Sequence, residues 1–185
     1  MDSIAQTTSG DIELDGVFRA GLREVPHFPI DGILFKDIAP LLAKPGILTK
    51  AVAAIEPLVA PLQVESIMAI DARGFVIGAA LADRLGAGFV MVRKPGKLPG
   101  KVHSFDYTCE YCSGRLEVTE GALQPGLKCL VVDDLLATGG TARATADFAK
   151  SLGAEVIGYT FLIEIEALKG RERLDDAPVV TLLRC

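Results

Sequence analysis

The sequence has no apolar run long enough to cross a membrane. Its longest uninterrupted nonpolar stretch covers residues 74–82, between Arg73 and Asp83. This is about half of the roughly twenty residues that a membrane-spanning helix needs. The N-terminal residues 1–15 contain acids but no Lys, no Arg and no apolar run, which fits neither a secretory signal nor a mitochondrial presequence. We therefore expect a cytoplasmic protein without a membrane partner.

Cysteine and basic charge are also scarce. Four cysteines in 185 residues, without a secretory signal, are typical of reduced thiols rather than of a disulfide framework. The formal net charge of −5 argues against nucleic acid as a partner held by a broad basic surface, but it leaves room for a local cationic pocket. The length and the 50% hydrophobic content suit one core, so we expect a single domain over residues 1–185.

Apolar periodicity predicts helices that alternate with short strands. The predicted helices cover residues 12–24, 47–62, 75–85 and 141–152, and the predicted strands cover residues 66–70, 89–92, 128–133 and 156–163. Residues 26–37 contain two prolines and a glycine and are predicted to be irregular. Strands separated by helices favour an α/β fold with a mainly parallel sheet, in which ligands bind at the carboxyl ends of the strands.

The most informative segment is residues 130–141, where an apolar strand leads into two acids and then a glycine-rich turn that opens a helix. The acids are Asp133 and Asp134, and the turn consists of Ala137, Thr138, Gly139, Gly140 and Thr141. Main-chain N–H groups at a helix start attract phosphate. Two carboxylates would repel phosphate and are better suited to accept hydrogen bonds from neutral hydroxyls. A ribose 5-phosphate presents both kinds of group.

Other interpretations of this segment explain less of it. A Walker phosphate loop would need Lys where Gly140 stands, and the spacing of a Rossmann GxGxxG is missing. An ordinary turn with Thr141 as a helix cap would explain neither the paired acids nor the paired glycines.

Two further polar segments follow predicted strands. Residues 71–74 read Asp-Ala-Arg-Gly, and residues 93–101 contain four cations among two prolines and two glycines. A solvated surface loop is the alternative for such a basic run. Because the carboxyl ends of parallel strands share one edge, we expect all three polar segments to meet there.

Residues 130–141 resemble the phosphoribosyl pyrophosphate (PRPP) motif of the type I phosphoribosyltransferases. The resemblance implies a three-layer fold, with helices flanking the mainly parallel sheet, a small N-terminal hood at about residues 26–42 and a flexible loop at about residues 95–115. It implies that residues 137–141 bind the 5-phosphate and that Asp133 and Asp134 orient the ribose hydroxyls. It also implies a cis peptide between Asp71 and Ala72. The pyrophosphate-binding residues would be Arg73, Arg93, Lys94 and Lys97.

Residues 105–118 resemble the signature of one branch of this family, the adenine phosphoribosyltransferases. The resemblance implies that Glu110, beside Tyr111, is the catalytic acid/base, a role typically worth about 10² to 10⁴ in rate. An exposed loop acid is the alternative for Glu110. The sequence departs from the family at Cys112 and Ser113, where glycine and then a polar or charged residue are common.

Residues 28–42 resemble the adenine-recognising hood of the same branch, and residues 168–174 resemble a family tail segment. By this resemblance Phe35 stacks on adenine, while the main chain of Leu34 and Lys36 reads its edge. A core position is the alternative for Phe35. Cys109 and Cys112 form a CxxC that could pair, or could bind zinc with His103.

The resemblance therefore implies conversion of adenine and PRPP into AMP and pyrophosphate, in purine salvage. Mg²⁺ is expected as a cofactor bound mainly through PRPP, without a metal site of the protein's own. A homodimer is implied as well. Two competing functions remain: a type I phosphoribosyltransferase for another base, and a PRPP-sensing regulator without catalysis, which would normally carry a winged-helix segment or a basic face.

Overall fold

The computed structural model describes residues 9–28, 30–108 and 113–185. The chain divides into two compact units, Met1–Ala54 and Ile55–Cys185. The expectation of a single domain stays a prediction.

The first unit contains a helix and a small hairpin. Its elements are α1 (Ser9–Gly21), β1 (Arg23–Pro26), β2 (Leu34–Asp37), α2 (Ala39–Leu42) and the first part of α3 (Ile47–Val59). The helix predicted at residues 12–24 is confirmed, although it begins earlier and ends at Gly21. Phe18, Ile38 and Leu41 are buried and form the centre of this unit.

The prediction that residues 26–37 are irregular is wrong for Pro26 and Leu34–Asp37, which are strand, and is confirmed for the described residues between them. β1 and β2 pair as an antiparallel hairpin, from Arg23 opposite Asp37 to Pro26 opposite Leu34. Pro26 is the last residue of β1, where its missing N–H does not interrupt the strand. An ion pair between Arg23 and Asp37 joins the two strands across the hairpin.

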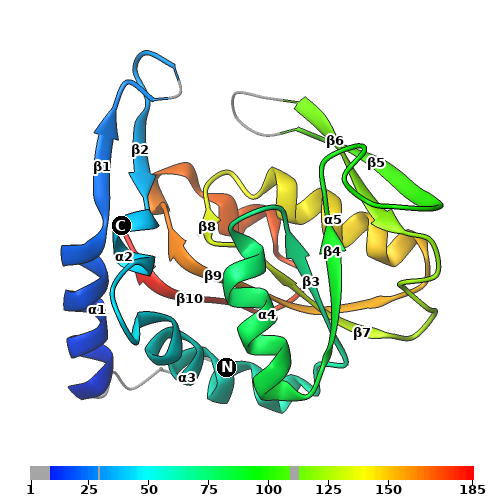
Figure 1. Cartoon of the computed structure of the whole chain (residues 1–185), viewed down its shortest axis with the longest axis horizontal. Helices are drawn as coiled ribbons and strands as arrows, with labels where there is room; N and C mark the ends of the chain where they lie inside the picture. Colours follow the sequence, from blue (N-terminus) through cyan, green and yellow to red (C-terminus); the bar gives the residue numbers. More distant parts are fainter. Residues whose placement is uncertain (1–8, 29, 109–112) are drawn as a thin grey trace. The chain divides into compact units, whose positions relative to one another are not determined.

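The second unit is built on a six-stranded sheet in which every pairing is parallel (Figure 1). Its strands are β3 (Ser66–Ile70), β4 (Gly88–Val92), β7 (Lys128–Val132), β8 (Leu135–Leu136), β9 (Glu155–Glu164) and β10 (Val179–Arg184). The order is β10-β9-β7-β3-β4, and β8 pairs with β9. The predicted strands at β3, β4, β7 and β9 are confirmed, whereas β8 and β10 were not predicted.

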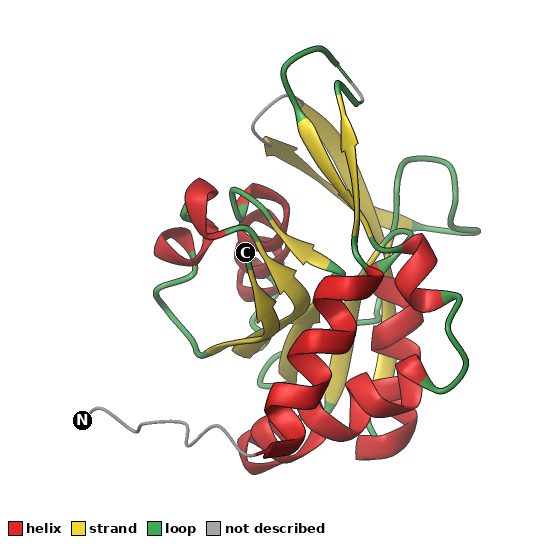
Figure 2. Cartoon of the chain, turned by 90° about the vertical axis from the view of Figure 1, so that its left-hand side faces the viewer, coloured by secondary structure: helices red, strands yellow, loops and turns green. Residues whose placement is uncertain are grey.

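Helices cover both faces of this sheet (Figure 2). A Cβ on Gly78 of α4 (Gly74–Leu85) would lie 2.7 Å from Ala69 Cβ, so α4 packs on the face of β3 that carries Ala69. Met68, on the opposite face of β3, belongs to a core cluster with Ala146 of α5 (Gly140–Ser151). Alternate residues of β3 therefore face different helices. The expected fold, a mainly parallel sheet between helices, is confirmed.

The chain also contains a second hairpin and a proline-containing helix. β5 (Val102–Thr108) and β6 (Ser113–Thr119) pair antiparallel, in a sheet of their own. Pro57 lies inside α3, which passes into a 3-10 turn at Ala60–Leu62. Two further 3-10 turns, Glu166–Leu168 and Gly170–Arg173, connect β9 to β10.

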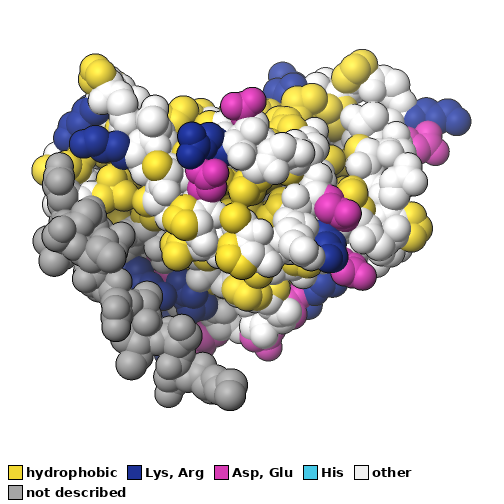
Figure 3. Space-filling model, turned by 90° about the horizontal axis from the view of Figure 1, so that it is seen from below, with side chains coloured by type: hydrophobic (Ala, Val, Ile, Leu, Met, Phe, Trp, Pro, Cys, Tyr) yellow, Lys and Arg dark blue, Asp and Glu magenta, His cyan; other side chains and the backbone are white. Residues whose placement is uncertain are grey.

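The surface carries charges of both signs. On the face in Figure 3, Lys and Arg side chains lie among Asp and Glu side chains rather than forming one basic area. In the part of the chain that the structure describes, no helix has both the length and the apolar character needed to cross a bilayer.

Candidate active site

The carboxyl ends of β3, β4 and β7 lie at one edge of the sheet. β3 pairs with β4, where Ile70 lies beside Val92. On its other side β3 pairs with β7, where Ala69 lies beside Val132. Asp71 donates its main-chain N–H to Val92 O over 2.8 Å, which joins the loop after β3 to the end of β4. The predicted meeting of three polar segments is confirmed.

Asp133 and Asp134 follow β7 at this edge. Asp134 is 3% exposed, and its main-chain N–H donates to Asp133 Oδ1 over 2.8 Å. Burial, then the neighbouring charge of Asp134 and a hydrogen bond with its side chain, raises the pKa of Asp133 well above its ordinary value. Ionising both carboxyl groups is therefore costly unless a cation or a hydrogen-bond donor lies beside them.

One oxygen of this acid pair lacks a donor. Asp134 Oδ2 is buried and accepts no hydrogen bond from any residue that the structure describes. Arg73 Nε lies 3.0 Å away, as an ion pair without hydrogen-bond geometry. A buried carboxylate oxygen without a donor is unfavourable. This atom is therefore suited to accept a hydrogen bond from a ligand hydroxyl.

A main-chain loop, residues 137–139, lies between β8 and α5. Gly139 precedes α5 with φ +77°, a left-handed conformation that glycine adopts without strain. No side chain caps α5, so the alternative in which Thr141 is a helix cap is wrong. The first N–H groups of a helix have no partner within it. They lie beside a cavity of about 70 Å³ that Asp133 and residues 135–142 line. This cavity suits a compact anion such as phosphate.

Gly74 brings the loop after β3 against the acid pair. A Cβ on Gly74 would lie 2.8 Å from Val132 O and 3.1 Å from Asp133 Cα, closer than a side chain tolerates. The peptide between Asp71 and Ala72 is cis, as the resemblance implied. The Arg73 side chain is 46% exposed, so it contacts Asp134 while part of it remains accessible to a ligand.

The basic loop after β4 has one cation that is fixed by other residues and three that are exposed, of which Lys101 lies 4.0 Å from Glu120. Arg93 Nε lies 2.9 Å from Asp71 Oδ2, and Arg93 Nη1 donates to Lys97 O over 3.0 Å. Arg93 thus orders the loop, a role that the sequence did not indicate. Lys94 and Lys97 are exposed, and neither forms an ion pair with another described residue. The loop therefore presents lysine ammonium groups to solvent.

Two carboxylates that order this loop were not predicted as site residues. Asp71 holds Arg93, and Glu117 Oε2 accepts the Gly96 N–H over 2.9 Å. The position of Asp71 directly after a buried strand was the available sequence signal. Glu117 had no comparable signal, because its partner lies on a different loop.

The predicted adenine-binding residues lie on β2 of the first unit. The Phe35 ring meets the Phe28 ring edge to face, with centroids 5.1 Å apart. Phe35 is only partly buried, so the alternative core position is wrong. Leu34 is 47% exposed, and Lys36 forms an ion pair with Glu24. The β1–β2 hairpin thus carries accessible apolar and aromatic surface.

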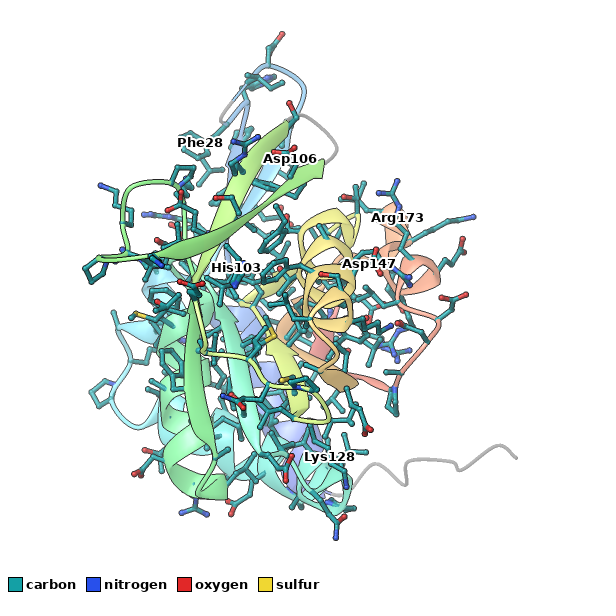
Figure 4. The ribbon with its side chains drawn as sticks, turned by 90° about the vertical axis from the view of Figure 1, so that its right-hand side faces the viewer. Phe28, His103, Asp106, Lys128, Asp147 and Arg173 are labelled. Carbon is teal, nitrogen blue, oxygen red and sulfur yellow. The ribbon has the colours of Figure 1, made fainter. Side chains whose placement is uncertain are left out.

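Four residues of the predicted flexible loop lie outside the described residues: Cys109, Glu110, Tyr111 and Cys112. They include Glu110 and Tyr111, whose predicted catalytic role stays a prediction. The hairpin on either side of them is described, and Figure 4 shows its His103 on an element that faces Asp147 of α5. The His103 ring lies 6.2 Å from the Phe148 ring. Within the described ranges, no group of three or more His, Cys, Asp or Glu could hold a metal ion.

A parallel sheet that ends in an acid pair and a main-chain loop at a helix start places this chain among α/β proteins whose site suits a ligand with both hydroxyls and a phosphate. The chain belongs to the phosphoribosyl transferase domain family, whose pattern matches residues 49–184.

The relatives narrow the class. The chain is 58% identical, over 98% of its length and 99% of the relative's, to adenine phosphoribosyltransferase 2 of Rhizobium etli. The crystal structure of adenine phosphoribosyltransferase from Thermoanaerobacter pseudethanolicus has a TM-score of 0.87 at 41% identity, over 93% of this chain and 99% of that one. The Saccharomyces cerevisiae enzyme, in complex with adenine and an iminoaltritol bisphosphate, has a TM-score of 0.83 at 38% identity, over 92% and 99%.

Proposed function

We propose that this protein transfers the 5-phosphoribosyl group of PRPP to adenine, giving AMP and pyrophosphate, and that it serves purine salvage. The observation that carries the proposal is the cavity after β8, which is lined both by the carboxylate residue Asp133 and by the loop of residues 137–139. A carboxylate and an anion cradle side by side match the hydroxyls and the phosphate of one sugar. The yeast relative, which was crystallised with adenine, supports the choice of base.

The sugar, the 5-phosphate and the pyrophosphate of PRPP have distinct partners in this proposal. Residues 137–141 hold the 5-phosphate with main-chain N–H groups, and the two aspartates accept hydrogen bonds from the ribose hydroxyls. Cations bind the leaving pyrophosphate, whose negative charge grows as the bond to the anomeric carbon breaks. These cations are Arg73, Arg93, Lys94 and Lys97.

Adenine attacks the anomeric carbon with inversion while the sugar develops oxocarbenium character. Glu110, beside Tyr111, removes the proton from N9 or keeps N7 protonated. On the hood, Phe35 stacks on the base, and the main chain of Leu34 and Lys36 reads its edge. A 6-oxo base would reverse the donor and acceptor at that edge and leave polar groups unpaired.

Mg²⁺ enters the site with PRPP in this proposal. The oxygen donors of Asp133 and Asp134 suit this hard cation, which keeps most of its ligands as water or substrate oxygens. When bound, Mg²⁺ neutralises the diphosphate leaving group. The protein's own residues then hold the sugar and keep the diphosphate oriented.

We also propose that the protein is a cytoplasmic homodimer. Val76 of α4 and Phe89 and Met91 of the edge strand β4 are 40%, 37% and 41% exposed. Exposed apolar side chains that gather on an edge strand are typical of association surfaces. Sedimentation at several concentrations would reveal the mass of the assembly, and a monomer at all of them would contradict this part of the proposal.

The test of the reaction is AMP formation from labelled adenine and PRPP with Mg²⁺. Adenine should react far faster than hypoxanthine or guanine. Equal rates would favour a transferase for another base, and PRPP binding without any product would favour the regulator.

The matched variants are Glu110→Gln and Glu120→Gln. Glu110→Gln should lower kcat by about 10² to 10⁴. Glu120 is an exposed acid, paired loosely with Lys101 over 4.0 Å, so its substitution should leave kcat unchanged. The same small effect in both variants would remove Glu110 from the mechanism.

A further inference from the structure

In the 3-10 turn Gly170–Arg173, the main chain of Gly170 lies directly against the main chain of the phosphate loop, residues 137–139. A Cβ on Gly170 would lie 2.1 Å from Ala137 O and 2.9 Å from Gly139 N. Seen from the other side, a Cβ on Gly139 would lie 2.6 Å from Gly170 O. Neither position has room for a side chain. The two backbones therefore pack directly against each other.

The atoms that Gly170 touches belong to the peptide groups that form the anion cradle. Ala137 O and Gly139 N lie on either side of Thr138, so a displacement there would turn the N–H groups of the loop. The beginning of the segment is held elsewhere, because Leu162 and Ile163 of β9 both donate to Asp134 O, over 3.0 and 3.1 Å. Gly170 is thus the contact that supports the middle of the loop.

An ion pair between the half-buried Arg171 and the buried Glu164 holds the turn in place. Arg171 Nε donates to Glu164 Oε1 over 3.0 Å, and Arg171 Nη2 donates to Glu164 Oε2 over 2.6 Å. Arg171 Nη1 also donates to Val179 O over 2.8 Å. A guanidinium that binds a carboxylate with two parallel bonds fixes orientation as well as distance. The turn is therefore tied to β9 and to β10.

Glu164 is charged in this arrangement. It is 5% exposed, and Thr181 Oγ1 donates to its Oε2 over 3.1 Å. Burial alone would raise the pKa of Glu164, but the hydrogen bonds and charge of Arg171 and the bond from Thr181 lower it below its ordinary value. The pair persists as a salt bridge at neutral pH.

None of these groups lines the cavity itself, whose walls are Asp133 and residues 135–142. Gly170, Glu164 and Arg171 can therefore act on a ligand only through the loop. We propose that Gly170 is a positioning residue for phosphate binding and that the pair of Glu164 and Arg171 keeps it against the loop. The inference rests on the proposed function, since it assumes that the loop binds the 5-phosphate.

The test compares the affinities of AMP and adenosine, measured by calorimetry, in wild type and Gly170→Ala. These ligands differ only in the phosphate, so their affinity ratio isolates what the loop contributes. Gly170 has no positive φ, so alanine there can keep the φ of the residue, and the added methyl group acts through its clash with Ala137 O. The ratio should fall at least tenfold, and the KM for PRPP should rise by a similar factor, while adenosine affinity and kcat at saturating PRPP stay within about threefold.

Gly88→Ala is the matched control. Gly88 also has no positive φ, and its added Cβ would lie 3.5 Å from Ser66 Oγ, an ordinary contact. It should keep the wild-type ratio. A merely structural effect of Gly170→Ala would lower the melting temperature and the active fraction without changing the ratio, and that result would overturn the proposal.

If Gly170→Ala does not fold, Arg171→Lys tests the proposed positioning role instead. Lysine keeps the charge but loses the parallel bonds to Glu164, so the AMP-to-adenosine ratio should fall in the same direction by about threefold or more. A wild-type ratio in folded Arg171→Lys would overturn the positioning role. If wild type itself does not prefer AMP over adenosine, the phosphate assignment fails instead of the positioning role.

Discussion

The loop after β8 and the loop after β4 both lie next to strands that end at the same edge of the sheet, but they offer different binding groups. Residues 137–139 present main-chain N–H groups that are packed against Gly170. The basic loop presents Lys94 and Lys97, whose side chains are exposed. Main-chain groups cannot adjust without moving the fold, whereas lysines keep their rotamer freedom. In the proposed function, the 5-phosphate is therefore bound by the shape of the main chain and the pyrophosphate by charge.

The largest loss of PRPP affinity is expected from Gly139→Ala, because this substitution changes the shape of the main-chain loop. Alanine would have to adopt φ +77° and would place Cβ 2.6 Å from Gly170 O. The main chain must move, and a displacement of about one ångström can cost on the order of 100-fold. PRPP affinity measured by calorimetry should fall by about that factor.

Gly126→Ala is the control that separates the strain of a positive φ from the clash of the added Cβ with Gly170. Gly126 has φ +80° but nothing within 4 Å of its added Cβ. It should lower stability slightly and leave PRPP affinity unchanged. Equal PRPP affinities in the two variants would contradict binding by a rigid main-chain loop.

Asp134→Asn should have the next largest effect, because it removes a charge from a buried acceptor while keeping its shape. A hydrogen bond to a charged group is worth about 1.5–3 kcal/mol, so kcat/KM for PRPP should fall by about 10- to 100-fold. Asp147→Asn, which weakens an exposed pair with Arg143 on α5, is the control and should change kcat/KM by less than about twofold. A similar loss in both variants would argue against a ribose contact at Asp134.

The cations should show graded and salt-dependent effects. Arg73→Ala should raise the KM for PRPP several tens-fold, because Arg73 lies 3.0 Å from the acid pair. Lys97→Ala should raise it only a few-fold. Because exposed charges are screened over about 3 Å at 1 M salt, the Lys97 effect should nearly vanish there. The Arg73 effect should shrink less, because Arg73 is ion-paired with the buried Asp134. Identical salt dependence of the two variants would contradict the distinction between a cation that pairs with a buried acid and an exposed lysine.

The smallest effect concerns stability and pH. The raised pKa of Asp133 means that the folded protein holds a proton that the unfolded chain releases. This contribution to stability is full below the unfolded pKa of about 3.9 and is lost as pH rises through the folded value. Asp133→Asn keeps an acceptor for the Asp134 N–H without the charge.

The ligand-free Asp133→Asn variant should therefore melt a few degrees higher than wild type at pH 7, and this gain should shrink toward pH 4. Its PRPP affinity should fall, because an amide is the weaker acceptor. Melting curves across this pH range test the expectation. A gain that grows toward acid pH would show that burial does not disfavour the Asp133 charge.

Much of the sheet could be predicted from sequence because its strands are compact apolar runs. The β3 run ends at Asp71 and the β7 run ends at Asp133, so charge marks both boundaries. The hairpin of β1 and β2 could not be predicted in this way. Pro26 and Pro29 each predict a break in regular structure. The pairing of Arg23 with Asp37 cannot be predicted from neighbouring residues, because the rest of the hairpin separates the two in the chain.

The candidate site shows the same difference between features that lie within one segment and contacts between distant segments. The acids and the glycines of the segment from Asp133 to Thr141 carry their chemistry in their order along the chain. The ion pair of Arg73 with Asp134 and the contact of Gly139 with Gly170 join distant segments. In the sequence, the only sign of a contact between two backbones is a glycine at the contact position. Glycine also occurs for other reasons, such as a turn that needs a positive φ, so this sign is not specific. Such contacts become visible only in three dimensions.

The parallel pairing of β3 with β7 also bears on the order of folding. Ser66 lies beside Cys129 although nearly half of the second unit separates them in the chain. Sheets with such distant pairings close slowly, because chain entropy is lost before the contacts form. The anion cavity further needs β9 and the turn at Gly170. A partly folded chain should therefore be unable to bind the ligand. Bound nucleotide should lower the rate of unfolding without raising the rate of folding.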